Sequence, residues 1–112
     1  MKAPVLNRPM LLEAPVRVPD DAGGFDVTWQ TLGTLWAQVV PGRGRERLEG
    51  ALPRTEVPVQ IILRGAPLGA DRRPDAGQRL RDGARVYALL AVTEHDIDGR
   101  YLICQALQEG AA

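Results

Sequence analysis

The stretch EVPVQIILR, at residues 56–64, carries the clearest secondary-structure signal in this chain. Its odd-numbered positions from 57 to 63 are all branched aliphatic residues, whereas Glu56, Gln60 and Arg64 lie among the even-numbered positions. An alternation of period two places every second side chain on the same face of a sheet, so it predicts a half-buried β-strand. Pro58 interrupts the run of backbone donors and favours an edge position or a bulge.

The C-terminal third predicts a hairpin. Residues 86–95 have apolar side chains at both odd and even positions, which favours a strand in the middle of a sheet or at a contact between subunits. The run from His95 to Arg100 supplies Asp and Gly in the pattern of a turn, and residues 101–107 resume an apolar run. The two apolar runs and their turn therefore predict a pair of antiparallel strands.

Three more extended segments are predicted in the N-terminal half. Residues 10–18 have the pattern of a strand, and a tight acidic turn follows at residues 20–24. Residues 25–32 then alternate apolar and polar side chains. Gly33 and Thr34 interrupt this alternation before residues 35–40 continue it.

Helical patterns are weak throughout the sequence. The best candidate is a turn or two at residues 45–52, and residues 75–80 form a weaker one. Prolines lie at or near strand ends or inside loops, with Pro15 and Pro58 at positions that favour an edge strand or a bulge. About six short strands with turn signals between them predict an all-β fold. We expect a small antiparallel β-barrel or sandwich with long loops and at most one short helix.

Size and composition indicate one soluble domain. The chain has 112 residues, of which 45% are hydrophobic, and we expect residues 1–112 to form a single domain. No apolar run approaches the roughly 20 residues that cross a bilayer, so we expect no membrane insertion. The N-terminus lacks the apolar core of a secretory signal, and the single Cys104 cannot form an internal disulfide. These features favour synthesis in a reducing cytoplasm.

Two long segments and the N-terminus lack a strand or helix pattern. Residues 1–9 are predicted to form an N-terminal arm, and residues 41–55 a long flexible loop. Residues 65–77 form a second segment rich in Gly, Pro and charge. Charge is also uneven, because residues 43–85 hold ten basic and six acidic groups although the net charge of the chain is zero.

The arginines of the 41–55 loop are the charged feature with a functional interpretation. Arg43, Arg45 and Arg47 alternate along the loop, and in an extended conformation they present three guanidinium groups to a nucleic-acid backbone. The alternative is a solvated loop in which these arginines pair with Glu46 and Glu49. The sequence leaves both open.

No residue pattern predicts catalysis, a metal site or a cofactor. His95 lies beside Asp96 and Asp98, but all three are in the predicted turn and no second His or Cys adds a further ligand. Cys104 alternates with apolar residues and has no further His to act as a base, which is typical of a core thiol. Residues 42–44 lack the third glycine and the following helix of a phosphate-binding loop. We therefore expect a protein that is not an enzyme.

Three aromatic residues are predicted to lie in the core or at an interface. They are Trp29, Trp36 and Tyr87, each within a predicted strand. The two tryptophans alternate with apolar residues, which is not the pattern of the aromatic platforms that bind single-stranded nucleic acid. This leaves packing inside the domain or against another subunit as their expected role.

Several short motifs, taken in order, resemble the head-tail joining proteins of long-tailed phages and gene transfer agents, also called head-closure or stopper proteins. They span nearly the whole chain. In sequence order they are Asp21-Ala22-Gly23-Gly24, Trp29, Leu35-Trp36-Ala37-Gln38-Val39-Val40-Pro41, Gly44-Arg45-Glu46, the strand that ends at Arg64, Val86-Tyr87-Ala88-Leu89 and Leu102-Ile103-Cys104. The chain departs from the family at residues 65–77, so the resemblance does not fix where the next strand begins.

The resemblance implies a structural role in a particle. Such proteins form a ring, of about six or twelve copies, between portal or adaptor proteins on the head side and tail terminator or tail tube proteins on the tail side. The ring closes a head filled with double-stranded DNA and receives the tail. In relatives a long loop enters the central channel and helps to retain DNA, and here that loop corresponds to residues 41–55. The implied location is the virion, assembled in the bacterial cytoplasm.

A second interpretation remains open at this level. A small β-barrel that binds nucleic acid as an adaptor, without belonging to a particle, also accounts for an arginine-bearing loop on a compact domain. Affinity for free duplex DNA with a steep salt dependence favours the adaptor. Stable association with portal or tail proteins favours the joining role.

Overall fold

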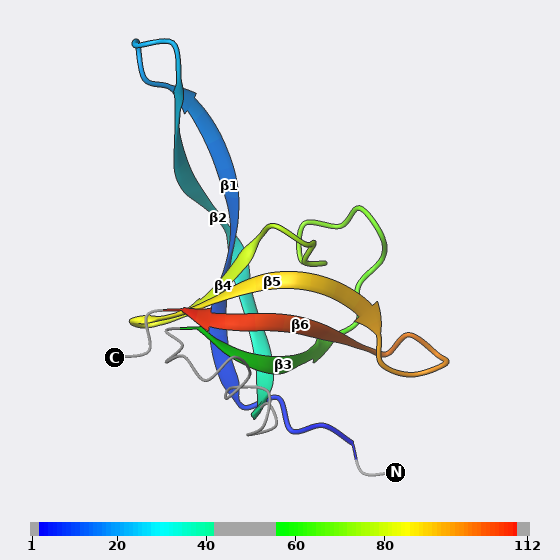
Figure 1. Ribbon diagram of the computed structural model, residues 1–112. Helices are drawn as coiled ribbons and strands as arrows, with labels where there is room; N and C mark the ends of the chain where they lie inside the picture. The colour runs from blue at the N-terminus through cyan, green and yellow to red at the C-terminus, as the bar shows by residue number, and fades with distance from the viewer. Residues whose placement is uncertain (1–2, 42–55, 110–112) are drawn as a thin grey trace.

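The computed structural model describes residues 3–41 and 56–109, and all regular structure in those ranges is β-strand. Six antiparallel strands close into a barrel in the order β1-β2-β3-β6-β5-β4 (Figure 1). Their bounds are β1 Arg8–Pro19, β2 Phe25–Pro41, β3 Val57–Arg64, β4 Arg79–Asp82, β5 Arg85–Glu94 and β6 Tyr101–Glu109. The predicted all-β antiparallel fold is confirmed. Within these ranges no helix is long and apolar enough to cross a membrane.

The strands agree with the predicted segments except at two places. Residues 25–32 and 35–40 belong to one continuous strand, β2. The weak helix at residues 75–80 is wrong, because Gly77 has a φ of 91° and the strand β4 begins at Arg79. In β4 the buried Leu80 lies between two arginines, which is a strand alternation too short to recognise. The helix candidate at residues 45–52 lies outside the described residues.

The core fills the inside of the barrel and draws on all six strands. Its apolar side chains are almost fully buried and come from alternate positions of each strand, as a closed sheet requires. They are Met10, Leu12, Ala37, Val59, Ile61, Leu63, Leu80, Tyr87, Leu89, Cys104 and Ala106. Burial of this set is the main stabilising contribution to the fold.

Two β-bulges change which positions face the core. In β5 the register against β6 shifts between Leu89 and Ala91, so the inward positions change from Leu89 to Val92 and the extra residue, Leu90, is exposed. This shift explains why the core positions of β5 change from odd to even numbers along the strand. In β2 the register against β1 shifts in the same way, with Leu32 as the extra residue between Thr31 and Gly33.

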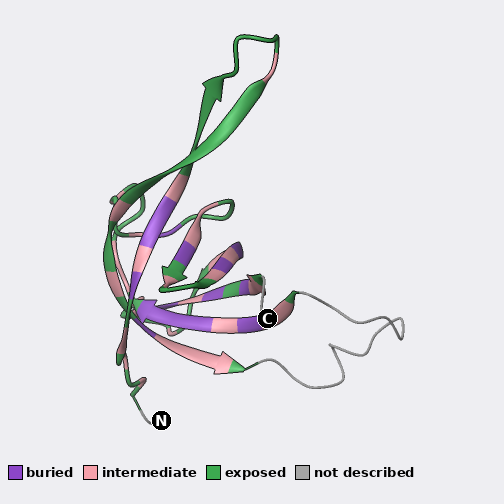
Figure 2. Cartoon of the chain, turned by 90° about the vertical axis from the view of Figure 1, so that its left-hand side faces the viewer, coloured by how far each residue is buried: buried purple, intermediate pink, exposed green. Residues whose placement is uncertain are grey.

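The first two strands are much longer than the barrel. β1 pairs with β4 only at residues 11–13, and β2 pairs with β3 only at residues 37–41. Between these limits β1 and β2 pair only with each other, and they leave the barrel as a two-stranded hairpin (Figure 1). We call residues 14–31 the projecting hairpin. Nearly all of it is exposed, in contrast to the barrel (Figure 2).

Candidate interaction surface

The tip of the projecting hairpin is a structured acidic turn. The Asp20 carboxylate accepts hydrogen bonds from the backbone N–H groups of Ala22, at 2.9 Å, and Gly24, at 3.0 Å. These two bonds favour the charged carboxylate and lower the pKa of Asp20. Asp21 and Gly23 adopt positive φ angles of 65° and 86°, which Asp and Gly tolerate better than other residues. The turn therefore holds two carboxylates at a defined place in solvent.

One face of the projecting hairpin is apolar and aromatic. The strand register places Phe25, Val27 and Trp29 of β2 on the same face as Pro15 and Arg17 of β1. Phe25 is 55% exposed and Val27 is 54% exposed. The Arg17 guanidinium lies 4.4 Å from the centre of the Phe25 ring, within cation–π range. Aromatic and arginine side chains together are typical of the centre of protein interfaces.

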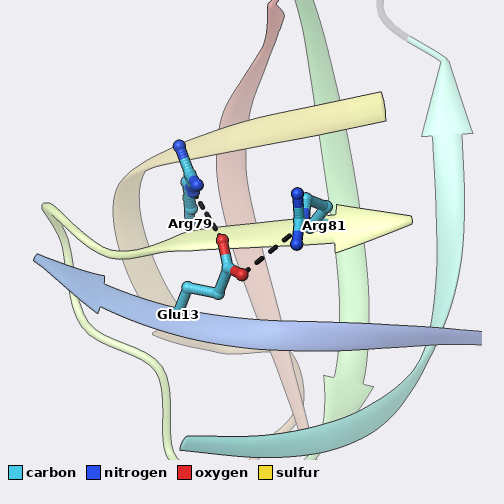
Figure 3. A network of polar contacts seen from close by, with 3 residues as sticks. All are labelled: Glu13, Arg79 and Arg81. Carbon is cyan, nitrogen blue, oxygen red and sulfur yellow. Dashed lines mark hydrogen bonds and ion pairs between the residues drawn. The ribbon is translucent and has the colours of Figure 1, made fainter. Parts of the chain in front are cut away.

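A charge cluster around the buried Glu13 fixes the root of the hairpin to the barrel (Figure 3). The Glu13 carboxylate accepts a hydrogen bond from Arg79 Nε at 2.6 Å and forms an ion pair with Arg81 Nε at 3.5 Å. Glu13 belongs to β1 and both arginines belong to β4. The Arg79 guanidinium also lies 4.0 Å from the centre of the Trp29 ring. The cluster thus joins β1, β4 and the first exposed aromatic ring of the hairpin.

A pocket of about 580 Å³ beside Trp36 is lined by residues of β2, by the end of β3 and by the segment that follows β3. Its apolar lining includes Leu6, Leu35 and Leu63, and the Trp36 side chain is 55% exposed. Arg64 and Arg72 also line it. The pocket therefore combines an apolar floor with two cationic side chains, a composition suited to a partner that brings apolar and acidic groups together.

The residues singled out from the sequence lie in different places. Tyr87 is 1% exposed and belongs to the core. Trp29 is 36% exposed and Trp36 is more exposed still, so within one chain neither is a core residue. An interface role for the two tryptophans stays a prediction. Arg43, Arg45 and Arg47 lie outside the described residues.

The phase of β2 explains why the two tryptophans are outside the core. The bulge at Leu32 reverses the alternation along β2. Odd-numbered residues lie on the outer face before the bulge, whereas the odd-numbered Leu35 and Ala37 after it point inward. Trp29 precedes the bulge and lies on the outer face. Trp36 follows it at an even position and also points away from the core. A uniform period of two along β2 would have put Trp29 in phase with Ala37.

Asp96 and Cys104, two of the groups considered for chemistry, have structural roles. The Asp96 side chain accepts a hydrogen bond from the Tyr101 N–H at 3.2 Å and so supports the turn between β5 and β6. Across residues 3–41 and 56–109 no group of three or more His, Cys, Asp or Glu side chains is placed to hold a metal ion. Cys104 lies in the core, and burial raises the pKa of its thiol to about 12.

Sequence reasoning missed the charge cluster at the root of the hairpin. Glu13 carried no signal because its two partners are more than sixty residues away in β4. The order Arg79-Leu80-Arg81 was a usable sign, because two arginines on either side of an apolar residue must share one face of a strand. Their partner on the neighbouring strand could be found only from the barrel register.

Comparison with known proteins supplies the family context. Residues 1–110 match the family model described as phage head completion protein. A chain from the structure of the virion of a native gene transfer agent particle is 46% identical, with a TM-score of 0.81, and the match covers 97% of this chain and 100% of that one. A protein of Shigella flexneri 2a, solved in solution, is 20% identical with a TM-score of 0.61 over 96% and 94% of the two chains, and shares the fold. No curated protein matches.

Proposed function

This chain belongs to the phage head completion protein family, and on that basis we propose that it forms a ring at the head-tail interface of a phage or phage-like particle. In that position it closes the DNA-filled head and provides the surface on which the tail docks. The observation that supports the proposal most is the 46% identity, over 97% of the chain, to a component of a gene transfer agent virion. The protein is accordingly a structural component of the virion.

The fold suits repeated assembly. The barrel is small and closed, so in the described residues it offers few free sheet edges outside the projecting hairpin. A protomer of this size gains strength from contacts repeated around a ring, at roughly 800 Å² per partner in a standard interface. Head-to-tail contacts close into a ring when their rotation divides the circle. Portal or adaptor proteins would then contact one face of the ring and tail proteins the other.

The loop at residues 41–55 is the proposed contact with packaged DNA. β2 ends at Pro41, β3 begins at Val57, and Pro41 pairs with Val59, so the intervening segment leaves and re-enters the barrel at one end. Arg43, Arg45 and Arg47 within it would contact phosphates without regard to base sequence. Such contacts are electrostatic, so they hold a DNA end while allowing its release.

Substitution of the three loop arginines tests the DNA-retention role. We expect particles that carry Arg43→Ser, Arg45→Ser and Arg47→Ser to assemble but to lose severalfold more DNA than wild type, because each lost cation removes a phosphate contact. Nuclease-sensitive DNA released from purified filled particles measures the leak, and the leak should increase with salt concentration.

A charge-conserving variant is the matched control. Replacement of the same three residues by Lys keeps the positive charge and should retain DNA nearly as well as wild type. Equal retention by the Ser variant and wild type would remove the DNA-retention role from the loop. Absence of the wild-type chain from purified particles would overturn the connector role itself.

A further inference from the structure

The projecting hairpin exposes an apolar face that the described chain covers only in part, where Arg17 lies over Phe25 and Arg79 lies over Trp29. Its outer face carries Phe25, Val27 and Trp29, and none of them packs in the core. A two-stranded hairpin is only marginally stable alone in water. A contiguous apolar face of this kind marks a contact with another molecule.

The Trp36 pocket offers a surface with complementary chemistry. It has an apolar lining of Leu6, Leu35 and Leu63, next to the half-exposed Trp36 ring. Its volume of about 580 Å³ lies in the range that accommodates a small-molecule ligand, so it has room for an aromatic side chain. The apolar residues of the hairpin could therefore be buried there.

The charges of the two surfaces are opposite. Residues 14–31 hold three carboxylates, Asp20, Asp21 and Asp26, and one arginine, which gives the hairpin a net charge of -2. Arg64 and Arg72 line the pocket, and neither forms an ion pair with another described residue. Opposite charges steer two surfaces together and set their register.

The two surfaces cannot meet within one molecule. Phe25 and Trp36 lie on the same strand, eleven positions apart, which corresponds to roughly 36 Å at about 3.3 Å per residue. Contact between them therefore requires two copies of the chain, each using a different surface.

We propose that the projecting hairpin of one copy docks at the Trp36 pocket of the next copy. The contact is head-to-tail, because the hairpin and the pocket are distinct surfaces, and repetition of such a contact produces a closed ring. The inference rests on the proposed ring and adds which parts of the chain join its neighbours. The hairpin supplies the aromatic face and the acidic tip, and the pocket supplies the apolar cavity and two arginines.

Cysteine cross-linking within assembled particles tests the contact. One variant carries Ala22→Cys at the exposed tip, a second carries Ala66→Cys in the pocket lining, and a third carries both. A short bis-maleimide should convert the double variant into a ladder of dimers, trimers and larger products. Neither single variant should form homodimers, whereas a mixture of the two should stop at dimers. The native Cys104 is buried and contributes no product.

Other patterns would overturn the inference. A tip variant that cross-links to itself would indicate a symmetric hairpin contact, and a tip variant that cross-links to a portal or tail protein would assign the hairpin to that partner. A double variant that enters particles but stays monomeric after cross-linking would exclude the contact while leaving the connector role intact. If the wild-type chain is absent from particles, the connector role fails, and this inference fails with it.

Two matched valine substitutions separate the two faces of the hairpin. Val27 lies on the outer face with Phe25 and Trp29, whereas Val18 lies on the opposite face. In the double-cysteine background, Val27→Ser should reduce the cross-linked ladder at least tenfold and Val18→Ser should leave it within about twofold. Trp36→Ala should act like Val27→Ser while the purified protein retains a cooperative urea transition. Equal effects of the two valine substitutions would contradict the proposed docking face.

Discussion

Glu13 is the buried charged residue of the described chain, and its two ion pairs connect β1 to β4. A buried carboxylate is expensive to desolvate, so its value depends on keeping both arginine partners. The arginine side chains are partly exposed, at 21% for Arg79 and 44% for Arg81. Water therefore still solvates part of each guanidinium group and weakens its attraction to the carboxylate. The Glu13 carboxylate thus acts at the root of the hairpin more by fixing the positions of β1 and β4 than by a net gain in Coulomb energy.

Glu13→Gln should lower the free energy of unfolding by about 2 kcal/mol, because it removes a charge-assisted hydrogen bond from a buried site. Urea unfolding of the purified protein measures the change. Arg100→Ala is the control, since the Arg100–Asp98 pair is exposed and spans 3.6 Å, and it should change stability by less than about 1 kcal/mol. A loss no larger than that of the control would show that the Glu13 cluster is dispensable for folding.

Because of Cys104, the stability of the folded protein should depend on pH in the alkaline range. Its pKa is raised to about 12 in the folded protein, whereas an unfolded thiol titrates near pH 8.5. Both states are protonated below about pH 8.5, so the full stability is present there. Above that value only the unfolded state loses the proton, and stability should decline by about 1.4 kcal/mol per pH unit until the folded thiol titrates.

The measurement compares alkylation rates with unfolding curves. At pH 8 the native thiol should react with iodoacetamide roughly a thousandfold more slowly than the thiol in urea, because the thiolate is the reactive form. Unfolding curves at pH 8 and pH 10 should show the alkaline loss of stability, and a Cys104→Val variant should show less of it. Equal alkylation rates in the folded and unfolded protein would contradict the raised pKa.

At the scale of the strand, bulges limited what the sequence could predict. The strand in residues 56–64 keeps one phase of the period-two alternation along its whole length, and it lies where expected, with Ile61 and Leu63 in the core. β2 and β5 each contain one extra residue, and this reverses the alternation partway along the strand. The interruption at Gly33 and Thr34 marked the irregularity in β2 but not Leu32 as its extra residue, and no local pattern marked Leu90. The inward positions beyond each bulge therefore needed the structure.

Short strands and long-range contacts also limited what the sequence could predict. β4 has four residues, too few for alternation to stand out from loop sequence, and only its pairing with β1 and β5 makes it a strand. The candidate interaction surface also depends on contacts between residues that are distant in sequence. Trp29 and Trp36 were recognised as unusual residues, but the apolar face of the hairpin and the pocket each combine side chains that are distant in sequence.

The projecting hairpin should be removable without unfolding the barrel. In a variant that replaces residues 16–28 by Asn-Gly, Pro15 and Trp29 remain as the last strand pair and the new turn is one that two-residue hairpins favour. The deleted segment supplies no core residue, so the free energy of unfolding should change by less than about 1 kcal/mol. Urea unfolding and circular dichroism test this. Loss of cooperative unfolding would mean that the hairpin is part of the folding unit.

At the scale of the whole molecule, the longest free sheet edges of the described residues are those of the projecting hairpin. The β1 edge of the hairpin contains Pro15 and Pro19, which cannot donate ladder hydrogen bonds. The β2 edge has no proline between Phe25 and Trp36. The two edges therefore differ in their capacity for unwanted strand pairing, and the prolines protect one of them. The fold class and the family followed from the sequence, whereas this asymmetry followed from the length of β1 and β2 beyond the barrel.

The continuity of β1 and β2 also has a mechanical consequence. A pull on the acidic tip passes along two unbroken backbones into the barrel wall, so it loads the pairs between β1 and β4 and those between β2 and β3 in shear, several at a time. The β1–β4 seam has three such pairs and the β2–β3 seam has five, which makes the first seam the weaker one. The Glu13 ion pairs cross that weaker seam and reinforce it. Tension applied at the tip would thus be carried where side-chain ion pairs reinforce the shortest ladder.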